Sequence, residues 1–363
     1  MKILWGDESV FKDESVFDPE YLPEILLHRD RQLDSIAVNL RPAIKGRSPI
    51  HTVCVGPPAT GKTSCVRFIL NKLQDFNVKS VYIRCPVHRT EYNIVSRIYE
   101  VGCRRLAPQK GVPIPSMLSE ISNSLEDPIV VVLDDINFLD IATADSLLYN
   151  FCKMHEEFAI KLGLICISTE VKFVGTLEMA GAVFHPDEIY FPLYDENEIR
   201  DILQWRVERG FYSGAMSNDA FDRIVELTAK HGDLRFGLYI LKMAGISAER
   251  RASRKVEVED VENVYRGGLK VFVAKSISAL NSDEREVLRT IYLIDEDISS
   301  GDLYGIIYNE VKMSYTRFYE ILEKLERLRL IDVVMGSKKK RGRTRYIIKR
   351  YDQVIILEAL KEF

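Results

Sequence analysis

Short apolar runs alternate with amphipathic stretches through the first half of the chain. The runs that predict strands are residues 51–55, 78–84, 128–133, 160–168 and 188–193. Between them, residues 63–75 and 90–105 have apolar side chains at helical spacing. Strands that alternate with helices are typical of βαβ units, in which helices cover both faces of a mainly parallel sheet. The sequence therefore predicts an α/β fold for this region.

The pattern changes to helices after Tyr194. Helical spacing continues through residues 199–207, 221–228 and 236–248, and Gly267-Gly268 indicates a joint. A third region begins at Ser276, and its predicted elements are helices at 282–293, 303–311 and 314–328 and strands at 331–335 and 344–348. Three helices followed by a β-hairpin predict a winged-helix module. A length of 363 residues suits the three domains that we predict, at 1–193, 194–275 and 276–363.

The composition is that of an ordinary soluble globular protein, with 46% hydrophobic and 29% charged residues. No apolar run approaches the roughly 18 residues that cross a bilayer. The start of the chain reaches Asp7 and Glu8 too soon for a signal peptide. The six cysteines include no close C-x-x-C pair, so they predict neither a zinc site nor a disulfide framework. We expect a cytoplasmic protein with no membrane partner.

A net charge of −4 hides a basic block near the carboxyl end. Residues 338–350 (KKKRGRTRYIIKR) hold eight of the 50 Lys and Arg and no acidic residue, which leaves 42 basic against 54 acidic residues elsewhere. Such a block on an acidic body often faces nucleic acid, although a solvated loop would have the same composition.

The segment after the first predicted strand matches the phosphate-binding pattern G-x-x-x-x-G-K-[ST] and opens a helix. Backbone N–H groups of the loop and of the helix start can surround a triphosphate, Lys62 can reach its β and γ phosphates, and Thr63 can ligate Mg²⁺. The predicted nucleotide contacts are Gly56, Pro57, Pro58, Ala59, Thr60, Gly61, Lys62, Thr63 and Ser64. The other interpretation is a chance turn between a strand and a helix.

The apolar strand at 129–133 ends in Asp134 and Asp135, as expected for the second half of such a site. Asp134 is the predicted Mg²⁺ ligand. Asp135 stands where many ATPases place a glutamate that orients the attacking water. Because aspartate is one methylene shorter, we expect slow hydrolysis at best. A strand that simply ends at an acidic turn would look the same.

Two further polar residues are candidates for phosphate contacts. Thr169 follows the strand at 160–168, although threonine at a strand end often belongs to a turn. Arg235 stands at a predicted helix start, where a cation does not suit the helix dipole and a phosphate ligand would explain it. The alternative for Arg235 is an ordinary surface residue.

The last predicted helix of the winged-helix module has a regular apolar face at Phe318, Ile321, Leu322 and Leu325. Its amino-terminal residues would read the major groove. The predicted DNA contacts are Ser314, Thr316 and Arg317 on this helix and Lys338, Lys339, Lys340, Arg341, Arg343 and Arg345 on the wing. A winged helix used for protein contacts is the alternative, and the basic wing favours DNA.

Taken together, these motifs resemble archaeal replication initiators of the AAA+ class, related to the large subunit of the origin recognition complex and to its helicase loader. Segments 11–24 and 27–33 are similar to the family's amino-terminal boxes, GPPATGKT and VVVLDDI to its Walker motifs, and residues 195–203 to its lid. The resemblance implies that Leu27, His28 and Arg29 hold adenine. It also implies that Arg235 is the sensor 2 arginine and that Thr169 lies near sensor 1, where the family commonly has Asn.

The resemblance further implies that residues 88–110 form an insertion that touches DNA, with Arg89, Arg104, Arg105 and Lys110 as candidate phosphate contacts; solvated helix charges are the alternative. The family usually has an arginine after sensor 1 that reaches a neighbour's ATP, whereas residues 173–184 contain none. This departure, with Asp135 and Thr169, indicates a divergent paralogue.

We therefore expect an initiator that binds ATP or ADP with Mg²⁺ and uses it as a switch, and that recognises double-stranded origin DNA. Expected partners are a paralogous initiator subunit and the replicative helicase. One alternative is a DNA-binding regulator, or a partner subunit of a heteromeric initiator, with little catalysis. Another is a signalling ATPase whose winged helix needs no DNA.

Overall fold

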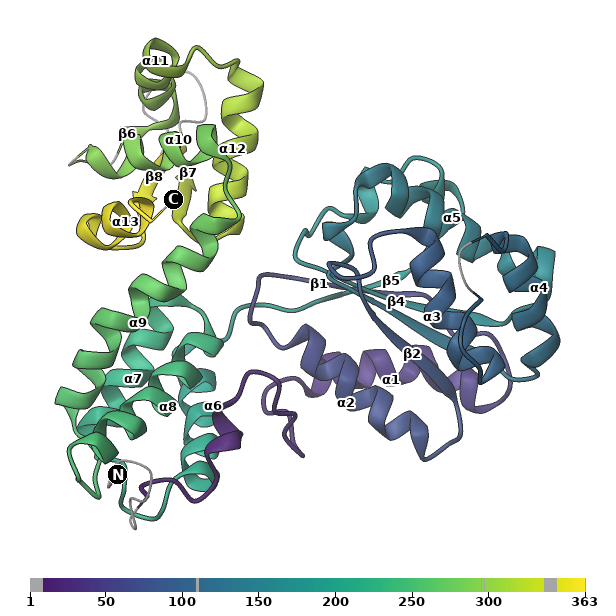
Figure 1. Cartoon of the computed structure of the whole chain (residues 1–363), viewed down its shortest axis with the longest axis horizontal. Coiled ribbons are helices and arrows are strands. Elements are labelled where there is room, and N and C mark those ends of the chain that lie inside the picture. The colour runs from purple at the N-terminus through teal and green to yellow at the C-terminus, as the bar shows by residue number, and fades with distance from the viewer. Residues whose placement is uncertain (1–8, 109–110, 295, 297, 336–344, 363) are drawn as a thin grey trace. The chain divides into compact units, whose positions relative to one another are not determined.

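The computed structural model describes residues 9–108, 111–294, 296, 298–335 and 345–362 (Figure 1). They form two compact units: a sheet unit, Glu20–Ile202, and a helical unit made of described residues 9–19 and 203–362. Within the described ranges, no helix combines the length and the apolar character that a membrane span needs.

The sheet unit contains a five-stranded parallel sheet in the order β2-β3-β4-β1-β5. Its strands are β1 (Thr52–Val55), β2 (Lys79–Arg84), β3 (Ile129–Asp134), β4 (Leu162–Ser168) and β5 (Asp187–Tyr190). Every residue of β1, β3 and β4 is buried, as expected for central strands covered on both faces. The predicted α/β fold is confirmed.

Helices cover both faces of this sheet and form two apolar cores (Figure 1). One core packs α1 (Asp30–Ile44) and α2 (Lys62–Gln74) against Val130 and Val132 of β3. The other packs α3 (Glu91–Cys103), α4 (Ile114–Ser124) and α5 (Ile141–Phe158) against Val131 and Leu133. Alternate residues of one strand thus serve opposite cores.

The helical unit begins with α6 (Glu196–Gly210), within which the chain passes from one unit to the other, and continues with α7 (Asn218–His231), α8 (Leu234–Arg250) and α9 (Val258–Ser278). Residues 9–19 pack on these helices. The rings of Phe11 and Phe17 each lie 4.9 Å from that of Phe211, and buried Arg206 donates a 2.6 Å hydrogen bond to the Val16 carbonyl. This segment therefore groups with the helices. The domain limits at 193/194 and 275/276 remain predictions.

The prediction of a joint at Gly267-Gly268 was wrong, because α9 runs through both residues without a break. A Cβ on Gly268 would lie 2.3 Å from the Tyr239 ring of α8. Close approach of two helices explains this glycine, and the sequence alone could not distinguish that requirement from a hinge.

The carboxyl end of the helical unit has winged-helix architecture, as predicted. Its elements are α10 (Ser282–Leu293), β6 (Ile298–Ser299), α11 (Ser300–Val311), α12 (Tyr315–Arg327), β7 (Ile331–Met335), β8 (Arg345–Lys349) and α13 (Gln353–Leu360). The strands form an antiparallel sheet in the order β6-β8-β7. The sequence did not indicate two of these elements, the two-residue strand β6 and the helix α13.

Candidate functional site

The loop between β1 and α2 has the conformation that its glycines permit. Gly56 has a φ of +147°, and a Cβ there would lie 2.3 Å from the Phe191 carbonyl oxygen. Gly61 has a φ of +87°, precedes the first residue of α2, and lies where a Cβ would be 2.7 Å from the Tyr194 hydroxyl. Both positions exclude larger residues, and the N–H groups that open α2 follow directly.

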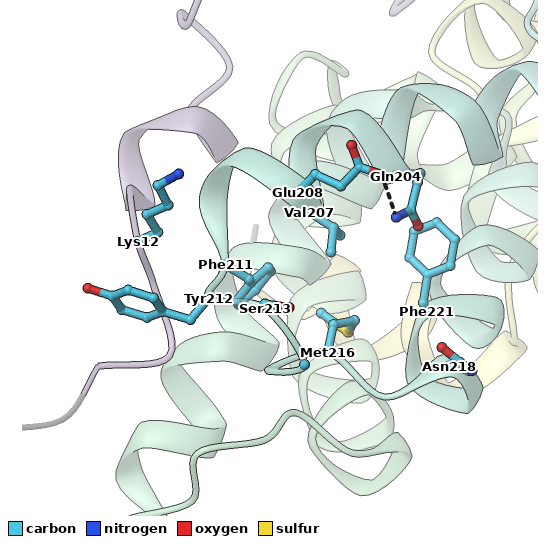
Figure 2. A pocket seen from close by; sticks show the side chains of 11 residues that line it. Lys12, Gln204, Val207, Glu208, Phe211, Tyr212, Ser213, Met216, Asn218 and Phe221 are labelled. Carbon is cyan, nitrogen blue, oxygen red and sulfur yellow. Dashed lines mark hydrogen bonds between the residues drawn. The ribbon is translucent and has the colours of Figure 1, made fainter.

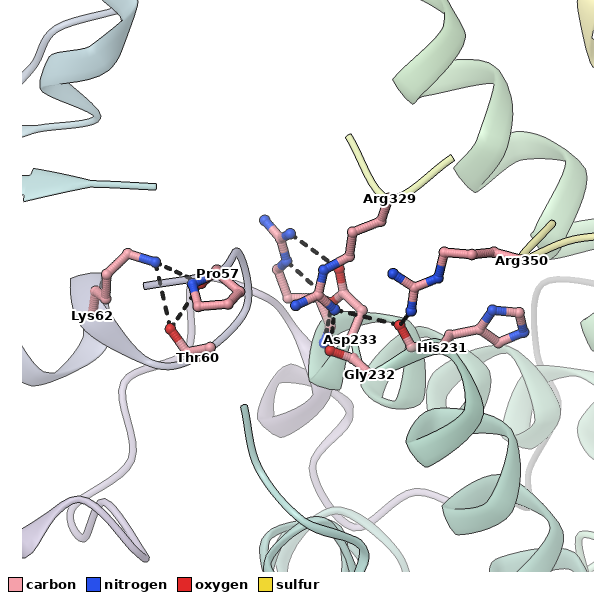
Figure 3. A network of polar contacts seen from close by, with 9 residues as sticks. Pro57, Thr60, Lys62, His231, Gly232, Asp233, Arg329 and Arg350 are labelled. Atoms are coloured by element: carbon pink, nitrogen blue, oxygen red, sulfur yellow. Dashed lines mark hydrogen bonds and ion pairs between the residues drawn. The ribbon is translucent and has the colours of Figure 1, made fainter. Parts of the chain in front are cut away.

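Lys62 lies inside this loop and is only 6% exposed. Its ammonium group donates to the carbonyls of Gly56 (2.7 Å) and Pro57 (2.6 Å), as Figure 3 shows for Pro57. Buried Thr60 also donates to the Pro57 carbonyl, at 2.8 Å. The positive charge is thus held within the ring of backbone groups predicted to surround phosphate. Pro58, Ala59 and Ser64, in the loop and the first turn of α2, are partly buried.

Asp134, at the end of β3, lies next to α2. The Thr63 hydroxyl donates to its carboxylate at 3.1 and 3.3 Å, and the hydroxyl of Tyr82, on the neighbouring strand β2, also donates to it. Burial and this hydrogen bond raise the pKa of Tyr82, so the phenol keeps its proton at neutral pH. The structure therefore brings together the two predicted Mg²⁺ ligands, and it adds a tyrosine that the sequence did not indicate.

Asp135 adopts a left-handed conformation, with a φ of +56°, which aspartate tolerates better than most residues. A short 3-10 helix, Ile136–Phe138, follows. Within it, the Asn137 side chain accepts a 3.2 Å hydrogen bond from the N–H of Thr169. This bond links the ends of β3 and β4, so Thr169 lies beside the acidic strand end; sequence reasoning missed Asn137.

Arg29 is 2% exposed and is held by backbone carbonyls. Its guanidinium donates to the carbonyls of Thr60 (2.9 Å), His28 (2.9 Å) and Pro192 (2.8 Å), and lies 3.6 Å above the ring of Tyr194. These contacts connect the loop between β1 and α2 to the chain after β5, so this side chain supports the loop.

The adenine role implied for Leu27, His28 and Arg29 remains a prediction. Leu27 and His28 are partly exposed, and the His28 ring lies 2.9 Å from the Asp201 carboxylate.

Arg235 lies in the first turn of α8, in the helical unit. Buried Asp233 caps this helix by accepting the Arg235 N–H at 2.9 Å, and its carboxylate also pairs with the half-exposed guanidinium at 3.1 Å. The dipole argument for a ligand is therefore weaker than the sequence suggested, because an acidic cap accompanies the arginine. A phosphate contact by Arg235 remains a prediction.

The predicted DNA-reading residues lie at the start of α12. Ser314 caps this helix by accepting the Arg317 N–H, and Thr316 is exposed. The Arg317 guanidinium pairs with Glu320 (3.0 Å) and with buried Glu284 of α10 (3.4 Å).

Glu284 also accepts a 2.6 Å hydrogen bond from Lys324. Burial alone would raise its pKa, but the hydrogen bonds from Lys324 and the Asn281 backbone hold the pKa of Glu284 below its usual value. Its negative charge thus holds two cations of α12 in place.

Most of the predicted wing contacts, Lys338, Lys339, Lys340, Arg341 and Arg343, lie outside the described residues, as does Lys110. Arg345 is described, and its guanidinium lies 5.1 Å from the ring of Tyr319. The Tyr315 and Tyr319 hydroxyls are 3.1 Å apart. Arg345, at the start of β8, therefore contacts α12 at the pair Tyr315 and Tyr319, which the sequence pattern did not reveal.

A pocket of about 590 Å³ lies elsewhere in the helical unit (Figure 2). Val207, Phe211, Met216 and Phe221 contribute its apolar part, and Gln204 donates a 3.0 Å hydrogen bond to Glu208 at its edge. None of the predicted site residues lines it.

Comparison with known proteins identifies the family. Residues 47–175 match the model of an AAA domain, and residues 200–266 match that of the Cdc6 AAA+ ATPase-type lid domain. The chain is 43% identical to ORC1-type DNA replication protein 2 of Archaeoglobus fulgidus, over 99% of this chain and 96% of that protein. It is 36% identical to ORC1-type DNA replication protein 3 of Haloarcula marismortui, over 99% and 98%. The chain belongs to the ORC1-type DNA replication protein family.

Solved structures agree with this assignment. The Orc1 protein of Aeropyrum pernix, solved in complex with DNA, has a TM-score of 0.69 and 26% identity over 97% of each chain. The ORC2 protein of the same organism, solved as ADPNP–ADP complexes, has a TM-score of 0.73 at 20% identity, over 97% of this chain and 98% of that chain, and supports the fold alone.

The protein is thus an AAA+ replication initiator of the Orc1/Cdc6 type. The predicted family and the predicted fold, an AAA+ domain with a helical lid and a winged helix, are both confirmed.

Proposed function

We propose that this initiator binds ATP with Mg²⁺ at the loop 56–64 and recognises duplex origin DNA through its winged helix, with the nucleotide acting as a switch. One observation supports the proposed nucleotide binding most directly. The Lys62 ammonium is buried inside a loop whose conformation requires glycine, and it lies 2.6 and 2.7 Å from two loop carbonyls. The complex of Aeropyrum pernix Orc1 with DNA supports the other half.

The residues present suit Mg²⁺. Thr63 and Asp134 offer hard oxygen atoms 3.1 Å apart, and Mg²⁺ in nucleotide sites takes one or two protein oxygens and completes its shell with phosphates and water. When bound, the ion would neutralise phosphate charge. Tyr82 orients the Asp134 carboxylate by hydrogen bonding, and Lys62 would supply a further positive charge at the phosphates.

We propose that Asp135 orients the attacking water in a slow hydrolysis. Asp135→Asn keeps a residue type that tolerates the left-handed backbone but removes the negative charge. We expect this variant to lower ATP turnover by about a hundredfold or more, the typical contribution of a general base. Nucleotide affinity should stay within about threefold, because the loop is untouched. Phosphate release, measured with and without duplex DNA, checks this; unchanged turnover would remove Asp135 from the proposal.

We propose that α12 enters the major groove, with Ser314, Thr316 and Arg317 toward the DNA, and that the basic wing neutralises phosphates. Replacing Lys338, Lys339, Lys340, Arg341, Arg343 and Arg345 by serine should lower the slope of log affinity against log salt by several charges, at about 0.9 per phosphate contact. Fluorescence anisotropy with a labelled duplex at several salt concentrations measures this slope.

A control variant neutralises the exposed residues Lys45, Arg47 and Lys72 of the sheet unit and should leave the slope nearly unchanged. The control removes three charges and the wing variant six, so a loss of slope in the control about half that in the wing variant would show that only net charge matters. An unchanged slope in the wing variant would defeat the wing assignment.

A second candidate function is a regulator or partner subunit without appreciable catalysis. It is favoured by the absence of arginine from residues 173–184. This stretch is fixed by buried Asp145, whose carboxylate accepts the N–H groups of Met179 and Ala180 at 2.8 Å each. A regulator would bind nucleotide and duplex but show no turnover for Lys62→Ala to abolish.

We further propose a paralogous initiator subunit and the replicative helicase as partners. We propose the cytoplasm, on the nucleoid, as the location.

A further inference from the structure

Two arginines at the edges of the winged-helix module contact the same helix end in the helical unit. Arg329 follows α12, and its guanidinium donates to the carbonyls of His231, at 3.3 Å, and of Gly232. Arg350 follows β8 and donates to the His231 carbonyl at 2.9 Å (Figure 3). These carbonyls are the carboxyl end of α7, which carries a partial negative charge. The two elements proposed to face DNA therefore share one anchor.

The anchor is buried and specific. Arg329 is 9% exposed, and a Cβ on Gly232, whose φ is +58°, would lie 3.2 Å from the Arg329 guanidinium. The His231 ring stacks on Tyr351 at 5.4 Å and is itself buried. Burial, together with nearby Lys230 and Arg350, lowers the pKa of His231 to about 4, so the ring adds no positive charge at neutral pH. A buried guanidinium is destabilising unless it is paired, so these bonds hold the module to the turn.

The turn that receives these bonds also positions Arg235. Gly232 ends α7, Asp233 caps α8, and the Asp233 carboxylate holds the Arg235 guanidinium at 3.1 Å. A displacement of α12 or β8 would move the carbonyls of residues 231 and 232 through these hydrogen bonds. The next residue is Asp233, whose carboxylate orients Arg235.

We propose that Arg329 and Arg350 are positioning residues that couple duplex binding at the winged helix to nucleotide binding through the turn 231–235. This inference rests on the proposed function and on the predicted contact of Arg235 with a nucleotide phosphate. By thermodynamic linkage, DNA then changes nucleotide affinity by the same factor as nucleotide changes DNA affinity.

The test measures the affinity of the full chain for a fluorescent ADP analogue with and without saturating duplex, and the affinity for duplex with and without ADP. We expect equal factors of about fivefold or more in the wild-type protein, the usual range for coupled sites. In the Arg329→Ala/Arg350→Ala variant both factors should fall to within about twofold of one. The affinity for the ADP analogue without duplex, and the affinity for duplex without ADP, should change little, because neither arginine is proposed to contact either ligand.

The matched control is Arg289→Ala, which removes a half-exposed arginine of α10 that pairs with Glu286 and should keep the wild-type factor. If the double variant does not fold, Arg350→Gln provides the test and should reduce the factor at least about twofold. The coupling is overturned if neither ligand changes the affinity of the wild-type protein for the other. It is also overturned if the variants keep the wild-type change in affinity. Failure of the wild-type protein to bind nucleotide or duplex at all would instead defeat the proposed function.

Discussion

Lys62→Ala is expected to weaken binding of ATP and ADP by about a hundredfold or more, while duplex affinity measured without nucleotide stays within about twofold. The substitution removes an ammonium group that is buried in the loop. Its charged hydrogen bonds to phosphate, each stronger than a neutral one, are lost with it. A hundredfold change corresponds to about 2.7 kcal/mol, which two such bonds can supply. Isothermal titration with Mg-ATP measures the loss.

The control for this variant is Lys72→Ala, which removes an exposed lysine from the same helix. It should bind nucleotide like the wild-type protein. Because Lys62 also bonds to the carbonyls of Gly56 and Pro57, thermal unfolding without nucleotide has to accompany the titration. Retention of wild-type affinity by a folded Lys62→Ala protein would show that the nucleotide binds elsewhere.

Arg29→Ala should lower the free energy of unfolding by about 3 kcal/mol or more and weaken nucleotide binding through the loop. The variant removes this donor from the buried carbonyl of Thr60 and from the partly buried carbonyls of His28 and Pro192. An unsatisfied buried group costs about 1–3 kcal/mol. It also removes the contact with the Tyr194 ring, worth up to about 2 kcal/mol in a buried setting. Urea unfolding followed by circular dichroism measures the change.

Arg31→Ala, at an exposed position on α1, is the matched control and should unfold like the wild-type protein. Arg29→Lys should recover only part of the stability, because an ammonium lacks the planar fork that serves three carbonyls at once. An Arg29→Ala protein as stable as the wild type would show that the loop does not depend on this residue.

Local patterns were enough to predict the strands, the glycine loop between β1 and α2 and the three helices of the winged-helix module. Each of these features is encoded by neighbouring residues, as in the loop from Gly56 to Thr63 or the apolar face of α12. The pair of Asp134 and Thr63 could also be expected, because a strand end and a helix start meet in this kind of site.

What the sequence did not reveal depends on residues far apart in the chain. Arg29 contacts the carbonyl of Pro192, and Arg350 that of His231, and no local signal marks such partners. Tyr82 occupies a strand position of ordinary composition, and only the parallel register of β2 and β3 brings it to Asp134. The prediction of a joint at Gly268 was wrong, because close helix packing and a hinge both favour glycine.

The central claim is that one polypeptide holds an adenine nucleotide at the Lys62 loop and a duplex at the winged helix. Native mass spectrometry of the purified chain, mixed with Mg-ATP and a short duplex, tests it most directly. The account predicts a species whose mass is that of protein, nucleotide and duplex together, with Lys62→Ala losing the nucleotide and keeping the duplex. Spectra of the wild-type protein in which no species carries both ligands would contradict the account.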